Sequence, residues 1–564
     1  MTLLSLMLLS CSGGSEGGGD APKGDPRART LVIAETADIQ HLLPVIYQMA
    51  TDGAVINNTN LQALHPSFDC ELKYEPELYE SWSWNEDHTQ LTVKVRDGVT
   101  WSDGVPVTGE DIQYTYELIG TPEVASPRLA YMDHMEGPPA LNEDGTVTFT
   151  YKHAYDEITM LAHASMVPIA KHSLKDADLA TLRGHERDSD PLITGPWKIE
   201  TWEKNQRIVL VPNENFTGPE ELKPKLDRVV IKIIPEYATQ IVELENGQID
   251  HMQQVLVADA DRLRKEQPDI ELHRRGWRSN DYIAWNGVDP QDYKAKKGDL
   301  GQGETLDWKD VKRHELFGDP KVRVALTKAI NTQKLIDDLL TGEDGTSYGQ
   351  PSVSTITPSL CDTHNNDITP FAFDPEAAKA ELKALGWEDR DGNGILENEA
   401  GTEFDFTLMT NSGNARRGKA AIIVQANLKD IGVKMEIEKL ETSTFYERAR
   451  KKDYDAVLAG WSAGLFVDMT DIWHTGDQYE FNFTAYSNPE VDALIDAAIK
   501  EPDPAKNNAM WKEAQALIYA DQPYTFLYWM DEIVAVNSRF SDEKVDILSP
   551  YGDLRQWDVQ AQPN

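Results

Sequence analysis

The chain has 564 residues, of which 40% are hydrophobic, and a formal net charge of −41 at pH 7. This length exceeds what one hydrophobic core supports, and the composition is that of a folded globular protein rather than a disordered one. The strong negative charge repels nucleic acid and anionic lipid headgroups, so we expect neither as a partner.

The first thirty residues predict export and membrane attachment. Residues 1–9 form an apolar run that is too short to span a bilayer and fits the core of a signal peptide. The segment from Leu8 to Cys11 reads Leu-Leu-Ser-Cys and resembles a bacterial lipobox, which implies removal of residues 1–10 and lipidation of Cys11. Residues 11–29 then provide a flexible tether. No Lys or Arg precedes the apolar run, so we expect the true start to lie upstream.

The mature part of the chain alternates predicted helices and strands. Thr108, Asp374 and Asn488 are each placed to cap a helix, and Pro follows the last two at the first helical position. A helix at 420–429 lies between two strand-like runs and predicts a β-α-β unit. We find no repeat period and no heptad pattern, and therefore expect a mixed α/β fold with several lobes. The runs that predict strands are 31–34, 91–95, 208–211, 229–234, 404–409 and 433–437.

Two cysteines remain besides Cys11, and they are far apart in the sequence. Spacing does not reveal geometry, so whether Cys70 and Cys361 pair is left open. The chain has no CxxC pattern, which gives no support to a thiol zinc site or a thioredoxin-like motif.

One segment carries the pattern of a catalytic serine. Gly460-Trp461-Ser462-Ala463-Gly464 matches G-x-S-x-G, the nucleophile elbow of serine hydrolases, and an apolar strand-like run precedes it. Asp468, Asp471 and His474 follow in Ser–Asp–His order. However, the elbow must lead into a helix and none begins there, and these partners are too close in sequence to arrive on later strands. A secreted serine hydrolase using Ser462 is therefore an alternative hypothesis.

Another segment resembles the first half of a calcium-binding loop. Asp389, Asp391 and Asn393 place oxygen atoms at alternate positions, and Gly394 stands at the sharp turn. The twelfth position, which should be a bidentate Glu, is Ala400. A plain acidic turn is therefore the favoured interpretation and a structural calcium site the alternative. We expect no other metal and no cofactor.

Six blocks, in order, carry a family resemblance. They are 76–82 with 91–117, 195–199 with 211–213, 244–250, 319–331, 452–460 and the helix that begins at 488. Together they resemble the family 5 extracellular solute-binding proteins, which include the dipeptide and oligopeptide receptors of ABC importers. Six matches in the right order are far more specific than any single one, because independent accidents would not preserve order.

The resemblance implies an α/β fold, a periplasmic-binding-protein type II-like two-lobed clamshell with an additional domain. It assigns 30–57, 190–278 and 519–564 to a discontinuous lobe I, 58–189 to the additional domain and 279–518 to lobe II. Receptors of this kind enclose their ligand between the lobes by hinge closure.

The resemblance also gives the segment 461–464 a role in binding. In peptide receptors of this family a Trp in this segment lines the cleft, and an Asp about three residues later commonly binds the α-amino group of the peptide. Trp461 matches the Trp, Gly464 stands at the Asp position, and Asp468 matches a later Asp. Burying an ammonium group without a carboxylate is costly. Either another acid serves here, or the ligand lacks that group.

Further contacts are implied on other segments. Arg416 is suited to hold a ligand carboxylate in a bidentate pair, with a solvated loop arginine as the alternative. Trp285 is equally consistent with a core aromatic. The complete set of implied contacts is Trp461, Ser462, Ala463, Gly464, Asp468, Tyr282, Trp285, Asn286, Asn411, Asn414 and Arg416.

These observations predict that the protein is the substrate-binding component of an ABC importer. We expect it to capture a small solute, with an oligopeptide as the first choice, and to deliver that solute unchanged to permease subunits. A sugar or a metal chelate is the alternative ligand, and a surface lipoprotein serving adhesion or sensing is the alternative role. We expect a monomer without enzymatic activity. We expect it in the bacterial cell envelope, periplasmic or at the cell surface, reaching the membrane only through lipid on Cys11.

Overall fold

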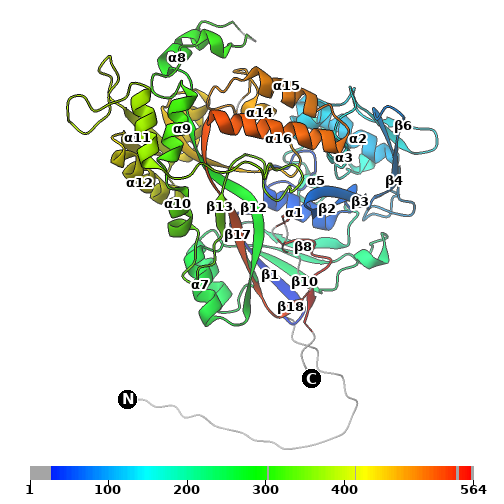
Figure 1. Ribbon diagram of the computed structural model, residues 1–564. Helices are drawn as coiled ribbons and strands as arrows, with labels where there is room; N and C mark the ends of the chain where they lie inside the picture. Colours follow the sequence, from blue (N-terminus) through cyan, green and yellow to red (C-terminus); the bar gives the residue numbers. More distant parts are fainter. Residues whose placement is uncertain are drawn as a thin grey trace, which may run out of the picture.

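The computed structural model describes residues 27–560, apart from 302–303, 413, 480, 542–544, 546 and 550. The predicted signal peptide and Cys11 lie outside the described residues. In the part described, one long sheet carries helices on both of its faces, and a smaller domain with its own sheets lies beside it (Figure 1).

Eleven strands of the described residues form the long sheet, in the order β15-β14-β16-β12-β17-β11-β1-β10-β9-β8, with β13 paired to β17. We use lobe I for the part built on β1 (Thr30–Glu35), β8 (Trp197–Glu203), β9 (Arg207–Pro212), β10 (Arg228–Ile233) and β11 (His251–Met252). We use lobe II for the part built on β13 (Gly349–Pro351), β14 (Asp405–Asn411), β15 (Lys434–Leu440) and β16 (Ala456–Ser462).

Two strands run through both lobes. β12 (Ile270–Trp285) and β17 (Tyr524–Asn537) pair antiparallel over almost their whole length, and Figure 1 shows them side by side through the centre of the molecule. Their register shifts between Arg275 and Ser279, where three residues of β12 face one of β17. A bulge of this kind bends and twists a strand pair. The two lobes are therefore joined by two bent strands, the architecture that permits a hinge.

Lobe I buries both faces of its sheet. Every residue of β1 is buried, which explains why this strand reads as a continuous apolar run rather than an alternating one. Leu31 and Ile33 join a core beneath α1 (Ala50–Thr59) and the C-terminal segment. Val32 and Ala34 join the opposite core, beneath α6 (Tyr237–Glu245) and α7 (Val257–Glu266).

Lobe II contains the β-α-β unit that the sequence predicts. β14 and β15 pair in parallel and are joined by α12 (Ala415–Asp430). The predicted caps also form, since the side chains of Asp374 and Asn488 accept hydrogen bonds from Ala377 N and Glu490 N. The other lobe II helices are α8 (Pro290–Gly298), α9 (Pro320–Lys328), α10 (Thr332–Leu339), α11 (Pro375–Ala384), α13 (Thr442–Arg450), α14 (Thr470–Trp473), α15 (Pro489–Ala498) and α16 (Pro504–Asp521).

The additional domain has a separate core around Trp101, Tyr116 and Phe149. Leu43, near the start of the chain, packs into the same core. Its strands are β2 (Leu64–Asp69), β3 (Glu71–Pro76), β4 (Tyr79–Trp84), β5 (Gln90–Val95), β6 (Ala140–Leu141) and β7 (Val147–Thr150), and its helices are α2 (Gly109–Gly120), α3 (Glu157–Ala164), α4 (Lys171–Leu174) and α5 (Glu186–Ser189). A short pair, β18 (Phe540–Ser541) and β19 (Asp558–Val559), ends the chain beside lobe I.

A disulfide joins the additional domain to lobe II. Cys70 lies at the turn of the β2–β3 hairpin with φ +62°, and its sulfur is bonded to that of Cys361, 291 residues further along the chain. This answers the question that the sequence left open. The hairpin tip is thereby fixed to the segment that follows β13.

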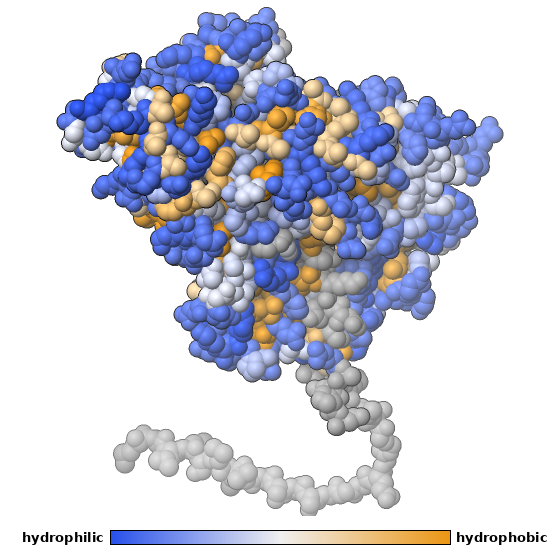
Figure 2. Space-filling view, viewed as in Figure 1, coloured by the Kyte–Doolittle hydropathy of each residue, from blue (hydrophilic) through white to orange (hydrophobic). Residues whose placement is uncertain are grey.

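The surface agrees with the high net charge. The face seen in Figure 2 is mostly hydrophilic, and hydrophobic residues are scattered over it in small groups. Within the range that the structure describes, no helix combines the length and the apolar character that a membrane crossing requires.

Candidate ligand-binding cleft

The segment from Trp461 to Ala463 is held at the crossing of the two lobes. β16 pairs antiparallel with β12, which places Trp461 opposite Asn280 and Ser462 opposite Ser279, beside the bulge. The side-chain oxygen of Asn280 accepts a hydrogen bond from Trp461 N at 3.1 Å. Arg278 forms two hydrogen bonds with Ala463. Its carbonyl accepts from Ala463 N at 2.7 Å, and its Nε donates to the Ala463 carbonyl at 3.1 Å.

Two pockets open where the chain leaves β16. The smaller has a volume of about 120 Å³, and Trp461, Ser462, Gly464 and Asp468 lie in its wall. The larger, about 280 Å³, lies between the same loop and the additional domain, and Asp468 lines it as well. The loop that follows β16 therefore forms the lobe II wall of a cleft whose other wall is the additional domain.

Aromatic rings surround Trp461. Its ring stacks with those of Tyr282 and Phe483, with centroids 5.9 and 5.6 Å away, and meets Phe481 edge-on at 5.4 Å. Tyr282 is buried and stacks in turn on Tyr524 at 3.9 Å. The half-buried Trp461 thus adds an aromatic side chain on a rigid support to the wall of the smaller pocket, and aromatic side chains are the usual lining of a small-molecule site.

Two histidines face this loop from the additional domain. His163 is buried, and its ring meets that of Phe466 edge-on at 6.4 Å. Burial lowers the pKa of His163 to about 4 and also lowers the pKa of His134, so both rings are neutral at neutral pH. In the described part of the chain, the Nδ1 atoms of both rings are buried without a hydrogen-bond partner. The sequence alone does not point to these residues, because no spacing pattern connects them to residue 466.

Arg416 lies in a different environment from the one predicted for it. Its Nε donates to Asp281 Oδ2 at 3.0 Å, and Arg417 Nε donates to Asp281 Oδ1 at 2.9 Å. Tyr528 adds a third donor, its hydroxyl, at 3.0 Å from Oδ2. Burial alone would raise the pKa of Asp281, but the two guanidinium groups lower it below its usual range. Arg416 is therefore engaged within lobe II by a carboxylate of the protein itself.

The two predicted asparagines of this region support the same cluster. Asn411 Oδ1 accepts from Arg417 Nη1 at 3.0 Å, and Asn414 Oδ1 caps α12 by accepting from Arg417 N at 3.0 Å. The structure thus brings Asn411, Asn414 and Arg416 together around Asp281. Asp281 and Arg417 were missed from the sequence, although an acid directly before the apolar run Tyr-Ile-Ala-Trp was a usable signal.

Trp285 and Asn286 lie at the far end of β12, away from the crossing. Trp285 is fully buried among core rings, 4.9 Å from Phe317, and donates its Nε1 hydrogen to Thr525. Asn286 is also fully buried, and its Nδ2 donates to the carbonyls of Lys452 and Tyr454 at 3.0 and 2.7 Å. The structure therefore places both residues in the framework of lobe II rather than beside Trp461.

A hydrolase site does not form around Ser462. Strand β16 ends at Ser462, and the next helix, α14, begins only at Thr470. His474 contacts Asp492 and Asp496 on α15 rather than the serine. The strand–turn–helix geometry of a nucleophile elbow is thus missing from this described segment.

A larger hollow, about 720 Å³, lies elsewhere, and Trp285, Arg313 and Asn488 are in its wall. It opens at the end of β12 opposite to the bulge, so hinge motion at the crossing would not enclose it. The two pockets beside the end of β16 are smaller, but they lie next to the crossing, and the one lined by residues 465–468 lies between lobe II and the additional domain. We therefore assign the candidate site to these two pockets.

A sheet shared by two lobes, two connecting strands and a cleft at their crossing define a bacterial binding protein of the periplasmic type II fold. The family description "Bacterial extracellular solute-binding proteins, family 5 Middle" matches residues 73–483. The chain belongs to this family. It is accordingly a solute-binding component of ABC transport that acts outside the cytoplasmic membrane.

Individual relatives agree in length and fold. The oligopeptide-binding protein AppA of Bacillus subtilis is 27% identical over 99% of this chain and 97% of its own. A solved structure of that protein with a nonapeptide has a TM-score of 0.70 and 25% identity, covering 94% of this chain and 99% of that one. NikZ from Campylobacter jejuni, solved with Ni(L-His), has a TM-score of 0.72 and 22% identity over 94% and 99% of the two chains, which shows the fold alone.

Proposed function

We propose that this protein captures an oligopeptide in the cleft at Trp461 and delivers it unchanged to the permease subunits of an ABC importer. The observation that carries the proposal is the position of segment 461–468, at the crossing of the lobes and in the wall of both pockets. The full-length similarity to a peptide-binding relative supports the choice of ligand.

The cleft offers groups that suit a peptide. Gly464, Phe466 and Asp468 of the loop are exposed and offer backbone groups to a ligand, and the aromatic ring of Trp461 suits side chains of different shapes. The buried Nδ1 atoms of His134 and His163, which lack partners in the described part of the chain, provide further polar contacts. A polar and apolar lining of this kind holds the common backbone of a peptide without fixing its sequence.

We infer that Asp468 receives the α-amino group of the peptide. Gly464 stands where the resemblance places the usual acid, whereas the exposed carboxylate of Asp468 lines both pockets. Its Oδ1 accepts one hydrogen bond from Thr470 N at 2.9 Å, which orients the carboxylate and leaves acceptor capacity for an ammonium group.

Titration calorimetry with tetra-alanine and with N-acetyl-tetra-alanine tests this assignment. Asp468→Asn should weaken binding of the free peptide by roughly 10- to 100-fold, the worth of a charge-assisted hydrogen bond. The same substitution should leave the acetylated peptide unaffected. Asp496→Asn, which removes a carboxylate that is 62% exposed on α15, is the matched control and should bind both peptides like the wild type. Equal affinities of the D468N and D496N variants for the free peptide would refute the role of Asp468.

We also propose attachment to the cell envelope through lipid on Cys11, and no enzymatic step. The lipobox-like segment at 8–11 supports the anchor. Metabolic labelling with palmitate should tag the wild type and leave the Cys11→Ser variant unlabelled. A fluorophosphonate probe should fail to label Ser462, because His474, the base that the motif would supply, contacts Asp492 and Asp496 instead.

The domain boundaries are proposed with one adjustment. We propose 30–57 and 190–278 for lobe I, 58–189 for the additional domain and 279–518 for lobe II, which places one boundary at the bulge of β12. Leu527 and Tyr528 pack in a core of lobe II. This favours a start near Asp531, rather than 519, for the last piece of lobe I.

A further inference from the structure

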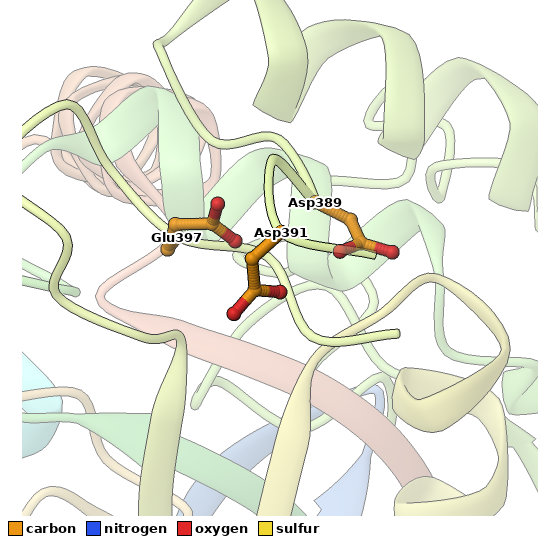
Figure 3. Close-up of side chains that lie close together, drawn as sticks. All are labelled: Asp389, Asp391 and Glu397. Carbon is orange, nitrogen blue, oxygen red and sulfur yellow. The ribbon is translucent and has the colours of Figure 1, made fainter. Parts of the chain in front are cut away.

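The loop between α11 and β14, on the surface of lobe II, brings three carboxylates together. One carboxylate oxygen from each of Asp389, Asp391 and Glu397 lies within 4.8 Å of the others. Figure 3 shows the side chains of Asp391 and Glu397 next to each other and that of Asp389 on the other side of the same turn. Oxygen ligands of one calcium ion, each about 2.3–2.6 Å from it, lie at most about 5 Å apart, so the spacing suits a shared ion.

Glu397 provides an independent observation that points to a ligand. Its side chain is 8% exposed, and its Oε1 accepts a hydrogen bond from Arg390 N at 2.6 Å. The other oxygen, Oε2, is buried and has no hydrogen-bond partner among the described residues. A buried carboxylate oxygen without a partner is rare and calls for an unseen proton, water or ion. Here it belongs to the carboxylate that faces two further acids.

Protein cations do not neutralise this cluster. In the described part of the chain, none of Asp389, Asp391 and Glu397 forms an ion pair with Lys, Arg or His. Arg390 is the nearest candidate by sequence, but its guanidinium donates to the backbone carbonyls of Glu397 and Gly386 instead. Three carboxylates held this close repel one another unless a cation is bound between them.

The base of the loop holds the cluster in place. Glu397 exchanges backbone hydrogen bonds with Glu388, at 3.0 and 3.2 Å, and forms a second bridge to Glu403. The residues that flank the loop, Trp387 and Phe404, are buried and pack on each other with ring centroids 4.7 Å apart. The position of Glu397 is therefore fixed by the core of lobe II before any ion arrives.

The structure also changes the set of ligands that the calcium-loop resemblance of Asp389, Asp391 and Asn393 predicted. Asn393 does not turn its side-chain oxygen to the cluster, because Oδ1 accepts from Ile395 N at 2.7 Å while Nδ2 donates to Asp391 Oδ2 at 3.2 Å. The carboxylate missing from the twelfth position, Ala400, is replaced by Glu397, the ninth residue of the loop, which folds back over Asp389 and Asp391. The backbone turns that allow this use Gly392 and Gly394, both with positive φ.

We propose that loop 388–403 binds one Ca²⁺ through Asp389, Asp391 and Glu397 and that the ion fastens this loop to lobe II. An all-oxygen set with several carboxylates selects a hard cation, and the remaining positions on the exposed side are open to water and backbone carbonyls. The ion is a structural fastener and lies outside the peptide cleft.

Trp387 gives the test a direct optical signal. Protein stripped with EDTA is titrated with Tb³⁺, whose emission is sensitised by a nearby excited indole, and Ca²⁺ is then added in competition. The wild type should show one saturable site from which Ca²⁺ displaces Tb³⁺, and its thermal midpoint should rise with Ca²⁺. Calorimetric titration with Ca²⁺ alone should give a stoichiometry of one.

Variants decide whether the named residues hold the ion. Glu397→Gln and the double variant D389N/D391N should each lower Ca²⁺ affinity at least about tenfold, since each removes anionic ligands. The double variant alters two exposed side chains, and each Asn keeps an oxygen that can accept the backbone hydrogen bonds from Gly392 and Asn393. An unchanged urea midpoint without Ca²⁺ then separates lost ligands from a lost fold. Glu399→Gln, an equal charge change at an exposed residue of the same loop, is the control and should bind like the wild type. Absence of a Ca²⁺ site in the wild type, or equal affinity in all variants, overturns the proposal.

Discussion

Asp281 shows at the scale of single residues how lobe II accommodates charge in its interior. The carboxylate is fully enclosed, and its two oxygens are shared between Arg416, Arg417 and the hydroxyl of Tyr528. A buried charge of this kind is tolerated only with partners, and removal of one partner leaves the others uncompensated. The cluster lies one residue from Asn280, which holds Trp461, so its integrity also fixes the wall of the cleft.

Asp281→Asn should therefore destabilise the protein by roughly 3 kcal/mol at neutral pH, because it leaves two arginines without a counter-charge. Urea unfolding measures this difference. The pKa of Asp281 is lowered in the folded state, so its contribution exists above the usual pKa of Asp and disappears as pH falls through the acid range. Asp405→Asn, which breaks an exposed pair with Lys434, should cost less than about 1 kcal/mol. Similar losses in both variants would contradict this account of the cluster.

Lys452 is buried, and its burial destabilises the folded state by an amount that depends on pH. It is 3% exposed, and burial lowers its pKa from 10.5 to about 7, despite the charge of Asp477. Between pH 7 and 10.5 the unfolded chain binds one proton more than the folded chain, so the stability of the wild type rises with pH over this range.

Lys452→Met should consequently stabilise the protein by an amount on the order of 3 kcal/mol at pH 7, and the gain should vanish as pH approaches 10.5. Denaturant unfolding at several pH values measures the gap. Lys451→Met, at a neighbouring side chain that is 68% exposed, should change stability little at any pH. Parallel pH curves for wild type and K452M would show that the amine is not buried as described.

At the residue scale, the sequence predicted the kinds of contact that side chains make better than it predicted which residues they contact. Trp461, which the resemblance of a local segment implied, lies in a pocket wall, and its role in binding stays a prediction. The roles of Arg416 and Asn286 were not visible, because their partners, Asp281 and the carbonyl of Lys452, are more than 130 residues away in sequence. Local pattern carries no information about such pairs.

At the scale of elements, β12 and β17 set the relation between the lobes. Their bulge at 276–278 lies beside the end of β16, so a change of bend there moves the wall that carries Trp461. The β14-α12-β15 unit and the capped helices α11 and α15 were predicted because their signals lie within ten to thirty residues. The strand order and the disulfide were not, because both depend on segments hundreds of residues apart.

The disulfide between Cys70 and Cys361 should contribute measurably to stability, because it closes a loop of 291 residues in the unfolded chain. The double variant C70S/C361S should lose roughly 2–5 kcal/mol of unfolding free energy. Both residues are exposed, so the substitution itself costs little packing. Dithiothreitol should lower the stability of the wild type to the level of the variant and leave the variant unchanged. Equal urea midpoints for oxidised wild type and variant would mean that the bond does not form.

At the scale of the whole molecule, two lobes and an additional domain meet around one small region. Lobe I and lobe II join through two strands, and the additional domain reaches lobe II through the disulfide and through the contact of His163 with Phe466. The loop 464–468 follows the strand end beside the bulge and faces the additional domain. A ligand bound there gains contacts in the closed arrangement that it lacks in an open one, and only such differential affinity shifts the equilibrium toward closure.

Native mass spectrometry of freshly purified protein tests the central claim most directly, since it measures the mass of the chain together with any ligand that it retains. The account predicts a complex of one chain with one oligopeptide, which is lost on mild denaturation and restored when the stripped protein is mixed with a pool of short peptides. A chain that binds no peptide from that pool, or that retains a sugar or a metal chelate in its place, would contradict it.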